Sequence, residues 1–251
     1  MNTQDIKSEI KFFDKIADKY DHYDTISEKD YKQILDKIIP YLGNNILDAG
    51  CATGDFAKRI KKIKANIKIS GIDLNKKFIK FATATGVYNK AICGNIEKEN
   101  IFKKSEFDTI VCLNLLHHFP DIKYVINNCY HWLKPNGYLI IADPNGSNLI
   151  LKISYFIRLF IRKFVRDNNC ASPNESHKTV GTFIKALSDF EIKKIDSLED
   201  NLPHPIKFLP FSLMNTLVYT RKKLLDFYKK LPFIKYGGCG LLIVARKNQI
   251  S

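Results

Sequence analysis

The feature that most constrains this chain is a glycine-containing loop between a strand pattern and a helix pattern. Residues 45–49 (Asn-Ile-Leu-Asp-Ala) are typical of a buried strand, and residues 54–64 are typical of a helix. The loop Asp48–Gly54 between them reads Asp-Ala-Gly-Cys-Ala-Thr-Gly. Such a unit places backbone N–H groups and a helix N-terminus beside a ligand. We therefore expect this loop to hold a cofactor.

The alternation of strand and helix patterns continues along the chain. Continuous apolar strands separated by helices predict a parallel sheet covered by helices on both faces. The expected fold class is α/β, with a Rossmann-like, doubly wound and mostly parallel sheet of seven strands. After the first strand, the sequence predicts strands at 67–73, 90–93, 107–113, 137–142, 189–197 and 239–247, and helices at 75–84 and 121–133.

A single domain is expected to span residues 1–251. Residues 5–39 have a helical pattern, which predicts an N-terminal helical lid. A helical cap that carries many basic residues interrupts the sheet before its final strands. The expected parts are the lid at 1–43, the cofactor-binding core at 44–146, the cap at 147–188 and 198–236, and the final strands at 189–197 and 239–247.

The cysteines and the N-terminus indicate the compartment. The six cysteines include no C-x-x-C pair, which argues against a zinc ribbon or a thioredoxin-like site. Scattered free thiols favour a reducing, cytoplasmic compartment. Residues 1–9 are polar and have no apolar run of the kind that a secretory signal needs. No metal site is expected.

The loop chemistry favours a cationic cofactor over a dinucleotide. Counted from Gly50, the dinucleotide template G-x-G-x-x-G requires glycines at positions where this chain has Ala52 and Asp55. A carboxylate at Asp55 would repel a pyrophosphate, whereas Asp48 and Asp55 are compatible with a positively charged cofactor. A dehydrogenase is therefore the least favoured function.

A third acidic residue, Asp73, lies where a ribose would be expected. Asp73 ends the second predicted strand, 23 residues after Gly50, and a carboxylate there can accept hydrogen bonds from both ribose hydroxyls. The alternative is that Asp73 caps the helix that begins near Asn75.

Five motifs in order resemble the class I S-adenosylmethionine-dependent methyltransferase family. The closest likeness is to its small-molecule branch, which includes enzymes of quinone biosynthesis. The resemblance covers roughly residues 10–145 and the final strand, and it implies S-adenosylmethionine as the cofactor. The motifs are Asp48–Gly54, Gly71–Asp73, Phe107–Val111, Leu116–Asp121 and Leu133–Gly137.

The resemblance also implies which residues bind the cofactor. Backbone at the glycine loop would approach the methionine part, and residues after the third strand would flank the adenine. The family usually has glycine where Ala52 stands and an acidic residue where Asn95 stands, although an asparagine oxygen can still accept from the adenine amine. The implied residues are Asp48, Gly50, Ala52, Gly54, Asp73, Leu74, Asn95, Ile96 and Asn114.

Methyl transfer from a sulfonium is an in-line displacement that requires no metal and no covalent intermediate. A general base is needed only if the acceptor must lose a proton, as a phenol or alcohol does. The candidates are His118 and His117, with Tyr23 as a lid residue over the cofactor. The histidine pair could instead be part of the loop's structure. Oxygen is favoured over nitrogen or carbon as the receiving atom.

Two basic segments suggest an anionic partner. The formal net charge is +14, and residues 147–166 contain five basic residues and no acidic one. On a helix these residues gather on one side, opposite an apolar and aromatic face, as in helices that lie at a membrane interface. We expect helices 147–166 and 217–231 to dock on an anionic membrane and collect a lipophilic or lipid-linked acceptor. Alternatively, the apolar face packs on the sheet and the charges stay in water.

Two other functions compete with this one. The sequence pI of about 9.4 would suit an RNA methyltransferase, but the Asn/Asp-Pro-Pro-aromatic tetrad typical of base-amine methylation is replaced by Asn114-Leu115-Leu116-His117. Nucleic acid is therefore not the favoured partner. A catalytically silent S-adenosylmethionine-binding protein would retain the same loop and the same Asp73.

Overall fold

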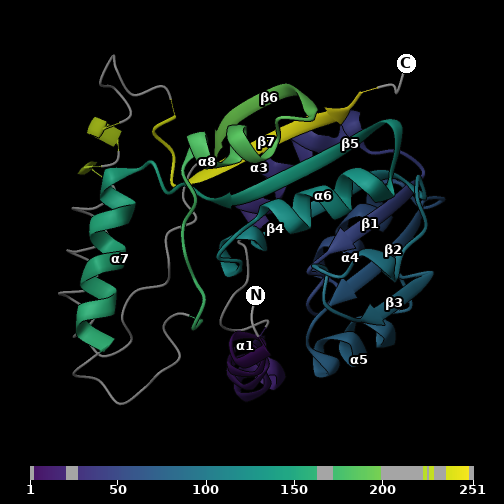
Figure 1. Ribbon diagram of the computed structural model, residues 1–251, viewed down its shortest axis with the longest axis horizontal. Coiled ribbons are helices and arrows are strands. Elements are labelled where there is room, and N and C mark those ends of the chain that lie inside the picture. Colours follow the sequence, from purple (N-terminus) through teal and green to yellow (C-terminus); the bar gives the residue numbers. More distant parts are fainter. Residues whose placement is uncertain are drawn as a thin grey trace.

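The computed structural model describes residues 3–20, 28–162, 172–198, 223–224, 226–228 and 236–248 (Figure 1). The N-terminal helical pattern is divided into α1 (Thr3–Ile16), the 3-10 turn η1 (Ala17–Lys19), α3 (Glu28–Ile38) and the 3-10 turn η2 (Ile39–Tyr41). Both runs of helical spacing expected within 5–39 are therefore present in helices, and α1 ends at Ile16.

The sheet contains the seven strands that the sequence predicts. They are β1 (Asn45–Ala49), β2 (Lys68–Asp73), β3 (Lys90–Cys93), β4 (Phe107–Leu113), β5 (Leu133–Pro144), β6 (Phe190–Leu198) and β7 (Gly240–Lys247). The helices between them are α4 (Asp55–Ile63), α5 (Lys76–Ala84), α6 (Lys123–Trp132), α7 (Leu149–Arg162) and α8 (Val180–Ala186), with short 3-10 turns η3 (Glu99–Ile101) and η4 (Leu116–His118).

The strand order confirms the predicted fold class. The order across the sheet is β3-β2-β1-β4-β5-β7-β6, with β1–β5 in parallel pairs and β7 antiparallel to both β5 and β6. The order reverses between β1 and β4, which pair in parallel from Ile46↔Thr109 to Ala49↔Cys112. In doubly wound sheets, ligands bind outside the carboxyl ends of the strands at this point.

Alternate strand residues enter two separate hydrophobic cores. Ile110 and Leu139 belong to the core that also contains Trp132 of α6 and Phe183 of α8. Their chain neighbours Val111 and Ile140 belong to the other core, which contains residues of α3 and α4. Because successive side chains of a strand point to opposite faces, helices cover the sheet on both sides.

Strand β5 is longer than the sequence pattern at 137–142 indicates. It begins at Leu133, which pairs with Phe107, and the register shifts before Tyr138 pairs with Thr109. The Pro-Asn-Gly signal at 135–137 therefore lies in an irregularity within the strand, where Asn136 has a φ of +64°. The apolar pattern predicted the strand only from residue 137, but pairing with β4 continues on both sides of this irregularity.

The predicted basic helix at 147–166 is represented by α7, which extends away from the sheet in Figure 1. Residues 163–171 and most of the second predicted basic helix, 217–231, lie outside the described residues. None of the helices within the described ranges is long and apolar enough to cross a membrane.

Replacement of Trp132 by Ala should destabilise the fold strongly. Its side chain is fully buried, packs edge-on against Phe102, and donates from Nε1 to the carbonyl of Glu99 at 3.1 Å. We expect the free energy of unfolding in urea to fall by about 3–5 kcal/mol. Tyr124→Ala is the matched control on the same helix, because Tyr124 is 61% exposed and should change stability by less than about 0.5 kcal/mol. Equal losses in the two variants would contradict this account of the core.

Candidate functional site

A cavity lies at the carboxyl ends of the parallel strands, where the strand order reverses. The open space between its lining atoms is about 790 Å³, solvent at its mouth included. The lining comes from α1, from Tyr20, from Phe78 of α5, and from the ends of β1–β4 with the loops and the η4 turn that follow them. It consists of Glu9, Ile10, Phe13, Tyr20, Gly50, Ala52, Ile72, Asp73, Leu74, Asn75, Phe78, Gly94, Asn95, Ile96, Leu113, Asn114, Leu115, His118 and Phe119.

The glycine loop presents its backbone to this cavity. The N–H groups of Gly50 and Cys51 both donate to the carbonyl of Ile72, which ties the loop to the end of β2. Gly50 has a φ of +71°, and a Cβ there would lie 2.7 Å from Cδ1 of Leu115. Ala52 also adopts the left-handed region, with a φ of +42°, a conformation that costs an alanine more than a glycine.

Asp73 occupies the position that its place in the sequence predicts. Its Oδ2 accepts from the backbone N–H of Ala52 at 3.0 Å and its Oδ1 accepts from that of Asn75 at 2.8 Å. The N-cap of α5 is Asn75, whose side chain accepts from the N–H groups of Lys77 and Phe78. Asp73 therefore supports the loop and the turn before α5, but it does not itself cap the helix.

Burial raises the pKa of Asp73 to about 6, against the hydrogen bonds that it accepts from backbone N–H groups. Burial also raises the pKa of Asp48 to about 7, although the hydroxyl of Tyr88 donates to Oδ2 of Asp48 at 2.6 Å. A positive charge or a hydrogen-bond donor on a bound ligand would favour the ionised form and so lower both pKa values again.

Not every predicted residue lines the cavity. Asp48 is 2% exposed and lies behind the loop, and Gly54, with a φ of +89°, is the N-cap of α4. His117 is also buried behind the lining. Tyr23 lies outside the described residues, and the remaining predicted residues all contribute to the lining: Gly50, Ala52, Asp73, Leu74, Asn95, Ile96, Asn114 and His118.

The charge of the cavity suits a cationic ligand. Its lining includes the acids Asp73 and Glu9, and no Lys or Arg lines it among the residues that the structure describes. A pyrophosphate would therefore meet two carboxylates with no Lys or Arg to compensate them among the described lining residues. The loop sequence predicts that Asp55 repels a pyrophosphate, but Asp55 is not part of the lining. It forms an ion pair with Arg59 on α4 at 3.1 Å instead.

Two asparagines complete the strand ends. Oδ1 of Asn95 accepts from the N–H of Glu97 at 3.0 Å, so this oxygen already has one donor from its own loop. Asn114 follows β4 with a φ of +48°, a region that asparagine tolerates better than most residues. Its N–H donates to the carbonyl of Ala142, which fixes the point where the chain turns out of the sheet.

Helix α1 supplies cavity residues that the motif reasoning did not name. Phe13 and Tyr20 both contact the ring of Phe78, at centroid distances of 5.7 and 4.6 Å, and Phe13 also contacts His118 at 5.5 Å. Ile10 and Glu9 complete this wall. The helical spacing of the apolar residues in α1 indicated a buried face, but no motif indicated which surface that face covers.

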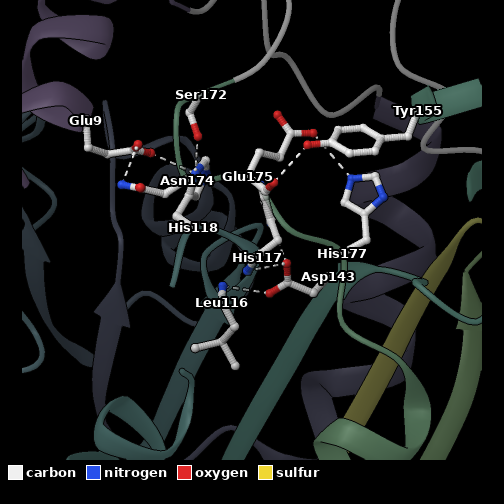
Figure 2. A network of polar contacts seen from close by, with 10 residues as sticks. All are labelled: Glu9, Leu116, His117, His118, Asp143, Tyr155, Ser172, Asn174, Glu175 and His177. Carbon is white, nitrogen blue, oxygen red and sulfur yellow. Dashed lines mark hydrogen bonds and ion pairs between the residues drawn. The ribbon is translucent and has the colours of Figure 1, made fainter. Parts of the chain in front are cut away.

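The two adjacent histidines have different surroundings, shown in Figure 2. Asp143 of β5 accepts from the backbone N–H groups of Leu116 at 2.9 Å and His117 at 3.2 Å, and from Nδ1 of His117 at 2.5 Å. His117 is thus part of the loop's structure. His118 points to the other side, where its Nδ1 lies 2.8 Å from Oγ of Ser172 and 2.9 Å from Oε1 of Glu9.

These surroundings separate the two imidazoles electrostatically. Burial, followed by the neighbouring His118, holds the pKa of His117 below its ordinary value. Burial alone would also lower the pKa of His118, but the contact with Glu9, aided by Glu175 and Asp143, outweighs it and raises that pKa. His117 is therefore the neutral member of the pair at neutral pH, and His118 is the more basic one.

Asp143→Ala should destabilise the protein because it removes one acceptor from three buried donors. We expect the free energy of unfolding to fall by about 3 kcal/mol. As a control, Asp36→Ala breaks an exposed ion pair with Lys32 in α3 and should cost less than about 0.5 kcal/mol. Urea unfolding of both variants measures the difference. A loss at Asp143 no larger than that at Asp36 would show that the loop does not depend on this carboxylate.

Known proteins resemble this chain in sequence over the same region. Residues 47–141 match the profile of a family described as "Methyltransferase domain". A demethylmenaquinone methyltransferase of Thermotoga maritima is 27% identical over 164 residues, which cover 62% of this chain and 71% of that protein. A ubiquinone biosynthesis O-methyltransferase of Vibrio parahaemolyticus is 27% identical over 55% of this chain and 63% of its own length. A protein of the same name from Xylella fastidiosa is 30% identical, over 44% of this chain and 46% of its own length.

Solved structures share the fold over nearly the whole chain. A SAM-dependent methyltransferase from Archaeoglobus fulgidus has a TM-score of 0.61 at 21% identity and covers 91% of this chain and 97% of its own. Another from Thermotoga maritima has a TM-score of 0.66 at 17% identity, and the match covers 95% of this chain and 99% of that protein's chain. The family match and the relatives show that this chain is similar in sequence to S-adenosylmethionine-dependent methyltransferases, among them enzymes of quinone biosynthesis, and the solved structures show that it has the class I methyltransferase fold.

Proposed function

We propose that this protein transfers a methyl group from S-adenosylmethionine to a small lipophilic acceptor, with an oxygen atom as the receiving atom. The observation that carries the proposal is the cavity at the carboxyl ends of β1–β4, which combines exposed loop backbone with the carboxylate of Asp73 and lacks a lining Lys or Arg among the described residues. This combination fits a cofactor that carries a ribose, an ammonium and a sulfonium.

Within this proposal, each strand end has a part in holding the cofactor. The backbone at Gly50 and Ala52 approaches the methionine part, and Asp73 accepts from the ribose hydroxyls, with Leu74 beside them. Asn95 and Ile96 flank the adenine, whereas Asn114 lies near the reactive end. Because they are not part of the lining, Asp48 and Gly54 support the loop from behind.

The chain's own contribution to the reaction is positioning and exclusion of water. The cofactor, when bound, supplies an electrophilic methyl group on sulfur. Ile10, Phe13 and Phe119 give the cavity an apolar wall that would hold a lipophilic acceptor in line with that methyl group. The names of the relatives in quinone biosynthesis support such an acceptor, and those named O-methyltransferases support oxygen as the receiving atom.

Asp73→Asn should weaken cofactor binding and remove most of its pH dependence. The pKa of Asp73 is raised to about 6 in the free protein, and ribose hydroxyls that donate to it favour the ionised form. Binding should therefore release protons near pH 6, and affinity should rise with pH from 5 to 7 and then level off. At pH 7 the variant should bind at least about tenfold more weakly, a difference of about 1.4 kcal/mol.

Calorimetry with S-adenosylmethionine in two buffers of different ionisation enthalpy measures both the affinity and the protons released. The control is Asp121→Asn, which changes an exposed acid outside the lining. An unchanged dissociation constant in Asp73→Asn would remove the proposed role of this residue.

We also propose that α7 and the segment at 223–228 bring the enzyme to an anionic membrane surface on the cytoplasmic side. Exposed apolar side chains at helical spacing support this: Leu149 is 56% exposed, Ile153 51% and Phe156 73%. The segment at 223–228 adds the exposed Leu224 and Phe227. Its Tyr228 accepts from the N–H of Leu149 at 3.4 Å, so the two exposed groups lie near one another.

Liposome co-sedimentation tests this surface. The protein should pellet with vesicles that contain phosphatidylserine and stay in solution with neutral vesicles, because the apolar residues are flanked by the exposed Lys152 and Lys223. Ile153→Ser combined with Phe156→Ser should reduce pelleting at least about fivefold, since two large side chains leave the interface. Tyr124→Ser, an exposed aromatic on α6, is the control. Equal pelleting with both kinds of vesicle, or with neither, would refute the proposal.

The acceptor itself is found by incubating the protein with S-adenosylmethionine labelled on its methyl group and a lipid-containing extract. The proposal expects a labelled product in the lipid fraction, identified by mass. Label in RNA would instead favour an RNA methyltransferase, and cofactor binding without any labelled product would favour a catalytically silent protein.

A further inference from the structure

We propose that Glu9 of α1 and His118 of η4 form a carboxylate–imidazole pair that takes the proton from a hydroxyl group of the methyl acceptor. This inference rests on the proposed function and specifies its acceptor as a hydroxyl compound. His118 is the catalytic residue in this proposal, and Glu9 is a positioning residue that acts through it. The pair joins the N-terminal helix to the loop after β4 (Figure 2).

Glu9 has an unusual position for a carboxylate. It lines the cavity yet is only 4% exposed. Its Oε2 accepts from Nδ2 of Asn174 at 3.1 Å. Oε1 lies 2.9 Å from Nδ1 of His118. A buried carboxylate is costly without a positive partner, and the imidazole of His118 is placed to supply one.

The contact with Glu9 also selects which nitrogen of His118 is free to act. An ionised carboxylate can only accept, so it favours the tautomer with the proton on Nδ1. Oγ of Ser172 lies 2.8 Å from the same nitrogen. Nε2 forms no hydrogen bond to any described residue, and the His118 side chain is 19% exposed and lines the cavity. Nε2 is therefore the atom left to receive a proton.

The surrounding charges give His118 a suitable basicity. Glu9 on α1, Glu175 on the loop after Ser172, and Asp143 on β5 all favour the imidazolium, whereas burial opposes it. Asp73 across the cavity interacts with it as well. The pKa of His118 is consequently held above its ordinary value, and a general base is most effective when its pKa lies near the working pH.

His117 does not share this role. Its Nδ1 is bound by Asp143, its ring is not part of the lining, and burial lowers its pKa. Its ring contacts that of His118 at a centroid distance of 4.0 Å and a tilt of 41°, and so helps to fix the orientation of the His118 ring. The pair thus divides into a structural and a reactive member.

The proposed step is balanced without any further reagent. As the acceptor oxygen forms its bond to the methyl carbon, the bond from sulfur to that carbon breaks and its electron pair stays on sulfur, which becomes a neutral thioether. The proton of the acceptor hydroxyl passes to Nε2 of His118, and Glu9 stabilises the resulting imidazolium. The proton leaves to solvent before the next turnover.

The test uses the full chain with a prenylated hydroquinone as acceptor, and measures the pH dependence of kcat/KM. In the unaltered protein kcat/KM should rise with pH through the pKa of His118. Glu9→Gln should move this rise to lower pH by about one unit, since an opposite charge nearby is lost. It should also lower the plateau about tenfold, and His118→Gln should lower it about 100-fold.

Two further variants separate a chemical role from a structural one. Glu9→Asp retains the carboxylate, so the rise should stay nearer its original pH even if the rate falls. Lys11→Gln, an exposed change on the same helix, should leave the profile unchanged. NMR titration of the His118 imidazole without acceptor should show the lower pKa directly in Glu9→Gln.

The outcomes distinguish this inference from the proposed function. Methyl transfer with the same pH profile and the same His118 pKa in Glu9→Gln would overturn the pair while leaving the proposed function intact. Transfer only to amine or carbon acceptors that lack a hydroxyl would overturn the pair and also the proposed oxygen acceptor, but not the methyl transfer itself. Absence of labelled product from the unaltered protein with any lipid fraction would overturn the proposed function, and this inference with it.

Discussion

The parallel pairing of β1 with β4 is the constraint on which the rest of the structure depends. It joins the two halves of the sheet, and helices cover β1 and β4 on both faces. Because both strands run in the same direction, their carboxyl ends meet at one edge, and the chain must leave the sheet there in diverging directions. The loop at Gly50, the turn at Asn114 and the acid at Asp73 all stand at this edge.

Local electrostatics in this protein differ from its overall charge. The chain carries a formal net charge of +14, yet the carboxylates that line its cavity, Asp73 and Glu9, have no Lys or Arg beside them in the lining among the described residues. Charges in solvent are screened within about 10 Å, whereas charges in a cavity act on its ligand directly. The net positive charge therefore affects what approaches the outer surface, whereas the two carboxylates determine the charge that a ligand meets in the cavity.

Hydrogen bonds connect the carboxyl edge of the sheet to Ser172. Asp143 of β5 fixes the η4 turn, and the turn carries His118 toward α1 and Ser172. The same helix, α1, packs Phe13 against Phe78 and His118. A change in the position of α1 would therefore alter both the apolar wall and the charge beside the imidazole.

Much of the fold followed from the sequence because its signals are local. Apolar runs bounded by turns predicted β1, β3 and β4 with the same bounds that the structure has, and the glycine loop and Asp73 predicted the cofactor edge. The extent of β5 was not predicted in this way, since the apolar run indicated only 137–142, whereas pairing with β4 and β7 extends the strand from Leu133 to Pro144. The motif likewise gave no indication that Asp48 and Gly54 do not line the cavity.

What the sequence determined by itself is the donor: a loop, an acid and an order of motifs that fit S-adenosylmethionine. Only the tertiary structure decided how the two adjacent histidines differ. Neighbours in the chain share the same local sequence, and what separates them is contact with distant residues, Asp143 for His117 and Glu9 for His118. Such contacts depend on the packing of whole elements against one another, and no pattern within a short segment encodes them.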